Sequence, residues 1–247
     1  MAEAFFHLRR PIESNNETIW LLSGPLTSGK TSLLFQFAYN AALPADRDDA
    51  FVVFICNQAR LRNKPPHLSQ TVDPTSDVFK RIQMKYVEDD QGVKNYFAAF
   101  HLLDKFPVAV IVDDFGDLFS ERTCRERYDN ARGRDMALVR TLALCRSAID
   151  YANERSFCRL LLSDTHQGDS PRSLFIYKKW IKSLFTIKDD GMGSFYLKNS
   201  HNSGVEKLGR KQVARYSITQ ECLQLHSLAE EGGIAHNNLH GDGNPWY

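Results

Sequence analysis

The stretch of this chain best suited to chemistry fits the pattern G-x-x-x-x-G-K-[ST], as Gly24-Pro25-Leu26-Thr27-Ser28-Gly29-Lys30-Thr31. Two glycines at this spacing let the backbone wrap so that successive N–H groups point at a phosphate. The lysine brings a positive charge to the β- and γ-phosphates, and the threonine hydroxyl can ligate Mg²⁺. The pattern predicts a loop that binds a nucleoside triphosphate and Mg²⁺. Its residues would be Gly24, Pro25, Leu26, Thr27, Ser28, Gly29, Lys30, Thr31 and Ser32.

The segments on either side are those that a phosphate-binding loop requires. Residues 18–23 are apolar and partly β-branched, which is typical of a buried strand. Residues 32–42 are apolar on most sides and are followed by Pro44, which predicts a buried helix whose N-terminus faces the phosphates. A chance glycine turn is the alternative, and the order strand, loop, helix disfavours it.

Two carboxylates, Asp113 and Asp114, follow a second apolar run at 108–112. A carboxylate at the carboxyl end of a parallel strand beside the loop's strand can hold Mg²⁺ directly or through a water. We expect Asp113, the first acid after the run, to bind the metal together with Thr31, and Asp114 to polarise a water. A helix-capping or turn aspartate is the alternative.

Composition bounds the remaining possibilities. A chain of 247 residues, 43% hydrophobic and 25% charged, can bury one substantial core, and its net charge of +1 neither favours nor disfavours a nucleic-acid partner. The five cysteines form no C-x-x-C pair, which predicts reduced thiols without a disulfide framework. No apolar run approaches the roughly 20 residues that cross a bilayer, and no signal peptide precedes the core. We therefore expect a soluble intracellular protein with no membrane partner.

Strands and helices are predicted to alternate along most of the chain. Helical spacing occurs at 92–103, 134–153 and 173–180, and strand-like runs occur at 51–56, 81–87 and 160–162. The polar segment 57–74 predicts an irregular loop, and a second polar segment, 115–133, is dense in arginine. Four further strand-like pieces, separated by Gly and Asn, predict antiparallel hairpins at 184–188, 194–198, 214–218 and 223–225.

This order predicts an α/β fold, with a largely parallel sheet covered by helices on both faces and antiparallel strands at the C-terminal edge. The nucleotide site belongs at the carboxyl ends of the parallel strands. Residues 1–17 are expected to be a short N-terminal lead, 18–225 one nucleotide-binding core, and 226–247 a loose C-terminal tail.

The phosphate-binding loop, the run 108–112 with Asp113, the helix 134–153 and the strand 160–162 occur at intervals that resemble the RecA-type ATPase core of eukaryotic recombinases and their paralogues. The resemblance covers about residues 18–225. A narrower resemblance is to the small SWIM-zinc-finger-associated paralogue of Shu-type complexes. The residues that carry it are Thr71-Val72-Asp73-Pro74 and Phe79-Lys80-Arg81-Ile82-Gln83-Met84-Lys85-Tyr86.

This resemblance implies an ATP-binding accessory factor in homologous recombination and DNA repair. Such a factor would bind ATP with Mg²⁺ and would bind single-stranded DNA. It would pair with a SWIM-domain zinc protein and support the filament of a recombinase or its paralogues. The same resemblance implies that it acts in the nucleus.

The sequence departs from active recombinases where a water must be activated. In that family the strand after the loop's helix ends in a glutamate that orients the attacking water, and Gln58 stands at the matching position. A glutamine can hydrogen-bond a water but cannot take its proton. With Lys30, Asp114 and Gln58 as the catalytic candidates, we expect at most a weak DNA-stimulated ATPase. The family's sensor glutamine has three candidate counterparts, Asp164, Thr165 and Gln167.

The resemblance assigns DNA contact to two loops, 115–134 and 166–182. Cations that track phosphates, mixed with aromatic rings that stack on bases, suit a sequence-tolerant single-strand site. The alternative is that the aromatic residues are helix core and the arginines are solvated or paired with nearby acids. The DNA-binding candidates are Arg122, Arg125, Arg132, Arg172, Lys178, Lys179 and Lys182.

Two other functions stay open. A degenerate phosphate-loop scaffold would bind nucleotide with negligible hydrolysis and would hold partner proteins, and Gln58 favours that function. A small-molecule kinase needs an arginine-bearing lid that closes over a second substrate. The segment 122–134 resembles such a lid, but the run of strands without helices after residue 184 disfavours a kinase.

Overall fold

The computed structural model describes residues 2–6, 17–43, 50–166, 168, 171, 173–201 and 212–230. Within them the chain forms one mixed sheet in the order β3-β2-β4-β5-β1-β6-β7-β8-β9. The strands are β1 (Ile19–Gly24), β2 (Val52–Cys56), β3 (Ile82–Tyr86), β4 (Ala109–Val112), β5 (Arg159–Thr165), β6 (Ser183–Asp189), β7 (Ser194–His201), β8 (Gln212–Ile218) and β9 (Leu223–Glu230).

The sheet has a parallel part and an antiparallel part. The strands from β3 to β6 in the sheet order pair in parallel, and β6, β7, β8 and β9 pair antiparallel. This confirms an α/β fold with a mostly parallel sheet and antiparallel strands at its C-terminal edge. Strand β9 continues to Glu230, so the sheet extends past the expected core boundary at residue 225. The rest of the predicted tail, 231–247, lies outside the described residues.

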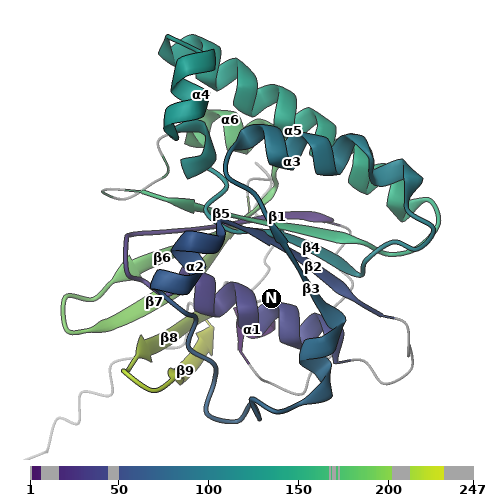
Figure 1. The fold of residues 1–247 in the computed structure, drawn as a ribbon. Helices are drawn as coiled ribbons and strands as arrows, with labels where there is room; N and C mark the ends of the chain where they lie inside the picture. The colour runs from purple at the N-terminus through teal and green to yellow at the C-terminus, as the bar shows by residue number, and fades with distance from the viewer. Residues whose placement is uncertain are drawn as a thin grey trace, which may run out of the picture.

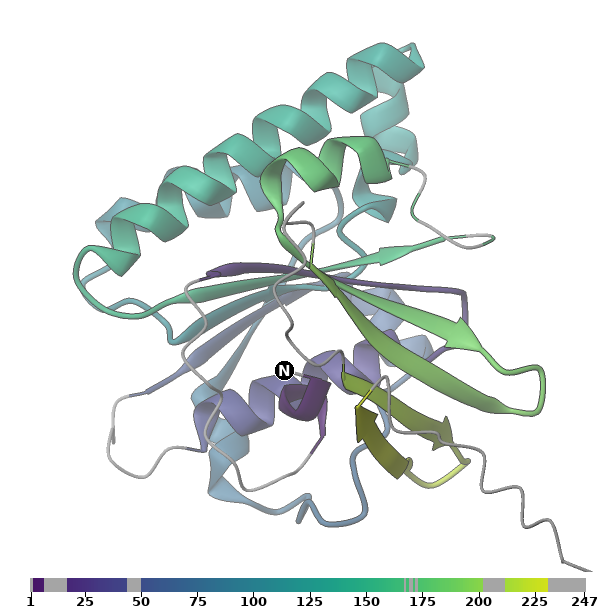
Figure 2. The same cartoon turned by 180° about the vertical axis from the view of Figure 1, so that it is seen from behind.

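Helices cover both faces of the sheet (Figure 1). Helices α1 and α2 lie on one face, and α3, α5 and α6 lie on the other, as the view from behind in Figure 2 also shows. None of the helices in the described ranges is both long and apolar enough to span a bilayer. The helices are α1 (Lys30–Ala42), α2 (Gln58–Asn63), α3 (Asp90–Ala98), α4 (Arg122–Arg127), α5 (Ala131–Asn153) and α6 (Leu174–Trp180), with 3₁₀ turns η1 (Ala2–Phe5), η2 (Asp77–Arg81), η3 (Phe100–Leu102) and η4 (Asp117–Phe119).

Strand β1 is buried along its whole length, because its side chains alternate between two cores. Leu21 packs in the core under α3, α5 and α6, whereas Trp20 and Leu22 pack in the core under α1. A strand held from both faces presents its carboxyl end, and the loop that follows it, in a fixed position.

Two segments expected to be loops contain helices. In the segment 57–74, α2 begins after Asn57, whose side-chain oxygen accepts a hydrogen bond from the Arg60 backbone N–H at 3.1 Å. Helix α2 buries none of its residues, so it has no apolar stripe for a sequence pattern to detect. Its stability at this length comes from the cap and from contacts outside the helix.

The polar segment 115–133 also folds, into η4, α4 and the first residues of α5. Helix α5 begins at Ala131 rather than at the expected residue 134, because the Asn130 side chain caps it by accepting a bond from the Gly133 N–H at 2.7 Å. Arg127 holds α4 against α3 through ion pairs with Asp89 and the fully buried Asp90. Charge pairs between helices carry no periodicity, which is why the prediction was wrong.

The N-terminal lead belongs to the core. Phe5 and Phe6 at the end of η1 are buried, and the Phe5 ring lies 5.0 Å from the Phe185 ring, 5.8 Å from Phe37 and 6.5 Å from Trp20, between ring centroids. A single 3₁₀ turn is too short to show a hydrophobic period. The expectation that the core begins at residue 18 was therefore wrong.

We expect Phe5→Ala to lower the free energy of unfolding by about 3–5 kcal/mol, because it removes a ring from a close-packed aromatic cluster. Phe175→Ala is the matched control, since the Phe175 side chain is 61% exposed. Urea unfolding of the two variants and the wild type measures the difference. Equal losses in the two variants would show that η1 does not belong to the core.

Candidate functional site

The turn between β1 and α1 has the conformation that its glycines permit. Gly29 has φ +73° and Thr27 has φ +64°, both in the left-handed region. A Cβ on Gly24 would lie 2.8 Å from the Ile187 Cβ on β6, closer than real carbon atoms approach. Both glycines of the sequence pattern are therefore required where they stand.

The antiparallel strands brace this turn from the side. The Tyr216 hydroxyl on β8 donates a hydrogen bond to the Ser28 carbonyl at 2.7 Å, and the Ser28 hydroxyl donates to the Pro25 carbonyl at 2.8 Å. The Ile218 Cδ1 lies 1.9 Å from where a Cβ on Gly29 would be. Strands far along the sequence thus help to fix the shape of loop 24–31.

Loop 24–31 and the first turn of α1 present backbone N–H donors at the N-terminus of that helix. The first backbone bond that closes this helix is donated by the Leu33 N–H to the Gly29 carbonyl, at 3.0 Å. The N–H groups that precede Leu33 in the first turn have no partner within the helix, and the positive end of the helix dipole lies there. That arrangement suits an anion.

Lys30 lies at the centre of the loop and is buried. Its ammonium donates to the Pro25 carbonyl at 2.9 Å and to the Gly24 carbonyl at 3.3 Å. Burial lowers the pKa of Lys30, while the charges of Asp114 and Asp113 oppose that decrease. A buried ammonium satisfied only by carbonyls still has strong affinity for a negatively charged ligand.

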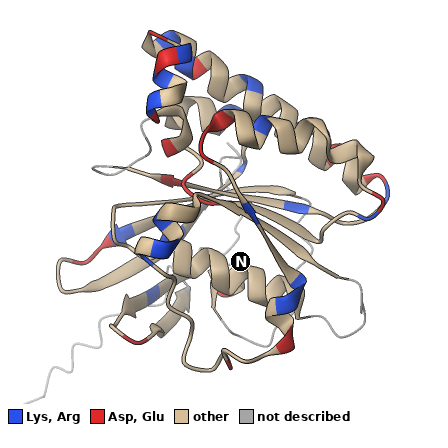
Figure 3. Ribbon diagram, in the orientation of Figure 1, with Lys and Arg blue, Asp and Glu red and all other residues tan. Residues whose placement is uncertain are grey.

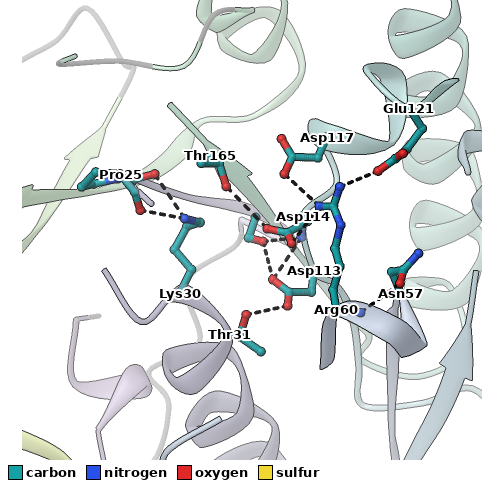
Figure 4. Close-up of polar contacts among 12 residues, drawn as sticks. Pro25, Lys30, Thr31, Asn57, Arg60, Asp113, Asp114, Asp117, Glu121 and Thr165 are labelled. Carbon is teal, nitrogen blue, oxygen red and sulfur yellow. Dashed lines mark hydrogen bonds and ion pairs between the residues drawn. The ribbon is translucent and has the colours of Figure 1, made fainter. Parts of the chain in front are cut away.

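Asp113 lies opposite Thr31, as predicted (Figure 4). The Thr31 hydroxyl donates to Asp113 Oδ2 at 2.7 Å, and the Ser163 hydroxyl on β5 donates to Asp113 Oδ1 at 2.8 Å. Burial and the neighbouring Asp114 charge raise the pKa of Asp113, while the two hydroxyls oppose that rise. A hydroxyl and a carboxylate so placed are a pair of oxygen ligands of the kind that Mg²⁺ takes.

The strand that carries Asp113 is not the neighbour of β1. We expected the two to lie side by side, but β5 lies between β4 and β1. The contact with Thr31 forms because Asp113 follows the end of β4 and the intervening residue on β5 is the short Ser163, which hydrogen-bonds to it. Asp114 next to it has φ +50°, and its N–H donates to the Ser163 hydroxyl at 2.8 Å.

A guanidinium from α2 contacts the acids beside this site. Arg60 Nη1 donates to Asp114 Oδ2 at 3.1 Å and to Asp117 Oδ2 at 3.0 Å, and Nη2 contacts Glu121 (Figure 4). The Arg60 side chain is 43% exposed. These ion pairs join α2 to the segment that contains η4 and the residue before α4.

These groups surround one cavity of about 590 Å³. Loop 24–31 forms its floor, residues 56–67 form one wall, and Asp113, Asp114 and Asp117 form another. No cluster of three His, Cys, Asp or Glu side chains that could hold a metal ion occurs in the described part of the chain. A metal here would need ligands from a bound phosphate or from water besides Thr31 and Asp113.

The other catalytic and sensor candidates differ in whether they line the cavity. Gln58 is exposed in the first turn of α2 and does not line the cavity, whereas Asn57 before it does. Thr165 lines the cavity, but Asp164 is buried and turned towards Gly116. Gln167 lies outside the described residues.

The described DNA-binding candidates lie on several different elements. Arg122 and Arg125 are exposed on α4 and Arg132 is exposed at the start of α5, and Arg122 pairs with Glu126. Blue and red segments alternate along α4, at the top of Figure 3. Lys178 and Lys179 are exposed on α6. Lys182 precedes β6 at the opposite, amino edge of the parallel strands, where its ammonium lies 3.2 Å from Glu17, and Arg172 lies outside the described residues.

Sequence patterns did not indicate Arg60, Ser163, Tyr216 or Ile218 as parts of the site. Each comes from an element far from loop 24–31 in sequence, and a single Arg or Tyr carries no spacing signal.

The segment 71–86, which carries the narrower resemblance, packs against α1 and does not line the cavity. Val72 is buried, and the Phe79 ring lies 5.2 Å from the Tyr39 ring of α1.

Comparison with known proteins gives no family assignment, since no family model matches the chain and no curated protein matches it significantly.

The free energy of unfolding depends on pH through the buried Asp164. Burial raises the pKa of Asp164 to about 7, the Tyr177 hydroxyl partly opposes that rise, and the Asp117 charge adds to it. An unfolded aspartate releases its proton near about pH 4. Between the two values the native state holds the extra proton, so the free energy of unfolding falls as the pH rises from about 4 to about 7.

We expect Asp164→Asn to raise the free energy of unfolding by about 2–4 kcal/mol at pH 8 and by about a third as much at pH 5. Urea unfolding at the two pH values measures the effect. Asp104→Asn, at an exposed position, is the control and should change neither value. A loss of stability at pH 8 in the Asp164 variant would mean that the carboxylate is needed in its charged form.

Proposed function

We propose that this protein binds ATP with Mg²⁺ at loop 24–31, and that this loop is a P-loop. The observation that carries the proposal is the 2.7 Å contact of the Thr31 hydroxyl with Asp113 beside the buried Lys30. Those are the groups that a phosphate-bound magnesium requires, from two segments that are distant in sequence. The cavity of about 590 Å³ has a volume that suits a nucleotide.

Each group has a separate task in this proposal. The N–H groups of loop 24–31 and the start of α1 hold the phosphates, and Lys30 exchanges its carbonyl partners for phosphate oxygens. Thr31 and Asp113 would hold Mg²⁺, which when bound neutralises charge between the phosphates. Ser163 keeps the Asp113 carboxylate oriented through its 2.8 Å bond.

The proposed site offers no good general base for hydrolysis of the bound nucleotide within the described residues. Within the described residues the acids that line the cavity are Asp113, Asp114 and Asp117, and no glutamate is among them. Asp113 accepts hydrogen bonds from Thr31 and Ser163, and Asp114 accepts hydrogen bonds from Arg60 and Thr165. A group that already accepts such bonds is a poor base, so we expect binding to dominate over turnover.

The exposure of Gln58 favours the second candidate, a scaffold that binds nucleotide for stability while it holds partner proteins. A small-molecule kinase is less well supported. The arginines of α4 that resembled a lid do not line the cavity, and Arg127 is paired with Asp89 and Asp90 on the α3 side.

The wider role that we propose rests on the resemblance described above. The fold with a mostly parallel sheet and antiparallel C-terminal strands is compatible with a RecA-type core. On that basis the protein is an accessory factor in homologous recombination, acts in the nucleus, binds single-stranded DNA and pairs with a SWIM-domain zinc protein. Its further partner would be a recombinase or one of its paralogues.

Nucleotide affinity is the first test. We expect Lys30→Ala to weaken Mg²⁺–ATP binding by about 10- to 100-fold, since a charge-assisted contact of this kind is worth about 1.5–3 kcal/mol. Lys80→Ala, at a side chain that is 82% exposed, should leave the affinity unchanged. Isothermal titration calorimetry with and without Mg²⁺ measures both.

Steady-state hydrolysis, with and without single-stranded DNA, then separates the functions. DNA-stimulated turnover supports the accessory ATPase, and binding without turnover supports the scaffold. Phosphate transfer to a metabolite would replace both with a kinase. If the wild type binds neither ATP nor ADP, the proposed function is wrong.

DNA binding has its own test at α6. We expect the double variant Lys178→Ala/Lys179→Ala to weaken single-strand binding and to reduce the slope of log affinity against log salt by about 1.4, or about 0.7 for each cation lost. The matched control is Lys80→Ala/Lys85→Ala, two exposed lysines near the β3 edge of the sheet. Fluorescence anisotropy over a salt series measures the slope. An unchanged slope in the α6 variant removes that helix from the DNA site.

A further inference from the structure

The Arg60 guanidinium lies at the cavity and is paired with acids. It lines the same cavity as Lys30 and Thr31, and its contacts in the described structure are with carboxylates. Asp114 and Asp117 also act electrostatically on Lys30. Lys30 and Arg60 therefore lie on two sides of the same pair of acids, as Figure 4 shows for the loop side and the α2 side.

Cationic and anionic side chains line the cavity in equal number. The cationic side chains in the lining are Lys30, Arg60 and Lys64, and the anionic ones are Asp113, Asp114 and Asp117. A triphosphate brings several negative charges into this space, and a Mg²⁺ ion offsets only part of them. The backbone N–H groups of loop 24–31 and the cations that already line the cavity would supply the rest.

Among those cations, Arg60 can be redirected at low cost. Its side chain is 43% exposed, and each of its three ion pairs, if valued as an exposed pair, is worth about 0–1 kcal/mol. Its backbone is fixed because its N–H donates to the Asn57 side chain at 3.1 Å, so the guanidinium can move while α2 stays in place. A planar guanidinium donates two parallel bonds to a phosphate, which an ammonium cannot do.

We propose that Arg60 recognises the terminal phosphate of a bound triphosphate, and that it leaves Asp117 and Glu121 to do so. This inference rests on the proposed function and names the residue that distinguishes ATP from ADP at that site. Because Asp117 belongs to η4 and Glu121 precedes α4, the exchange also frees that segment from α2 when the triphosphate is bound.

The test compares ATP and ADP affinity in four proteins by calorimetry with Mg²⁺. We expect Arg60→Ala to weaken ATP binding by about 10- to 100-fold and to change ADP binding by less than about twofold. Arg60→Lys should recover only part of the loss, because it keeps the charge without the fork. Arg62→Ala, an exposed arginine of the same helix that does not line the cavity, should behave as the wild type.

A variant of Glu121, one of the acids paired with Arg60, should change the ATP affinity in the opposite direction. Glu121→Gln removes one competitor for the guanidinium without touching the cavity lining, so it should tighten ATP binding by up to about fivefold and leave ADP unchanged. If Arg60 merely braces the acids, this variant weakens the binding of both nucleotides or leaves both affinities unchanged, which would overturn the inference.

Hydrogen exchange supplies a readout that does not depend on affinity. In the wild type, amides of 117–127 should exchange faster with saturating ATP than with saturating ADP, and this difference should vanish in Arg60→Ala. Equal loss of ATP and ADP affinity in Arg60→Ala, or no loss, overturns the inference while the proposed function stands. A wild type that binds neither nucleotide overturns both.

Discussion

The hydrogen bond between the Thr31 hydroxyl and Asp113 is the contact on which the site depends. It joins the start of α1 to the end of β4, two positions that are 82 residues apart, at a separation of 2.7 Å. Asp113 is buried, and besides this bond its carboxylate accepts hydrogen bonds from the Ser163 hydroxyl and the Asp114 N–H, as a buried charge requires. The contact thus fixes the acid relative to loop 24–31 and satisfies a costly buried group.

That contact is useful only because the loop itself is held in shape. The parallel part of the sheet sets where β1 ends, but loop 24–31 is held in place by side chains from later strands, Ile187 against Gly24, Ile218 against Gly29 and Tyr216 on the Ser28 carbonyl. The C-terminal strands are therefore more than an extension of the sheet. Through a buried phenol and two aliphatic side chains they determine which residues the loop can accept at its glycine positions.

Local patterns in the sequence predicted the parts of the site that one segment specifies. Loop 24–31, the strand before it, the helix after it and the acid after 108–112 each carry their own spacing. The position of β5 between β4 and β1 could not be predicted, because strand order depends on pairing between distant segments. The burial of Phe5 in a single 3₁₀ turn is hidden for a similar reason, as is the ion pair that holds Lys182 at the opposite edge.

Arg60 shows why charged residues are hard to interpret before the fold is known. As a sequence feature it is one arginine in a polar stretch, and the pattern there predicted a loop. In the fold it contacts three acids beside a cavity whose cationic and anionic side chains are equal in number. For the proposed ligand this balance makes the metal part of recognition. A triphosphate without Mg²⁺ would meet the carboxylates of Asp113, Asp114 and Asp117 as well as the three cations of the lining, whereas the ion lets Asp113 attract the ligand rather than repel it.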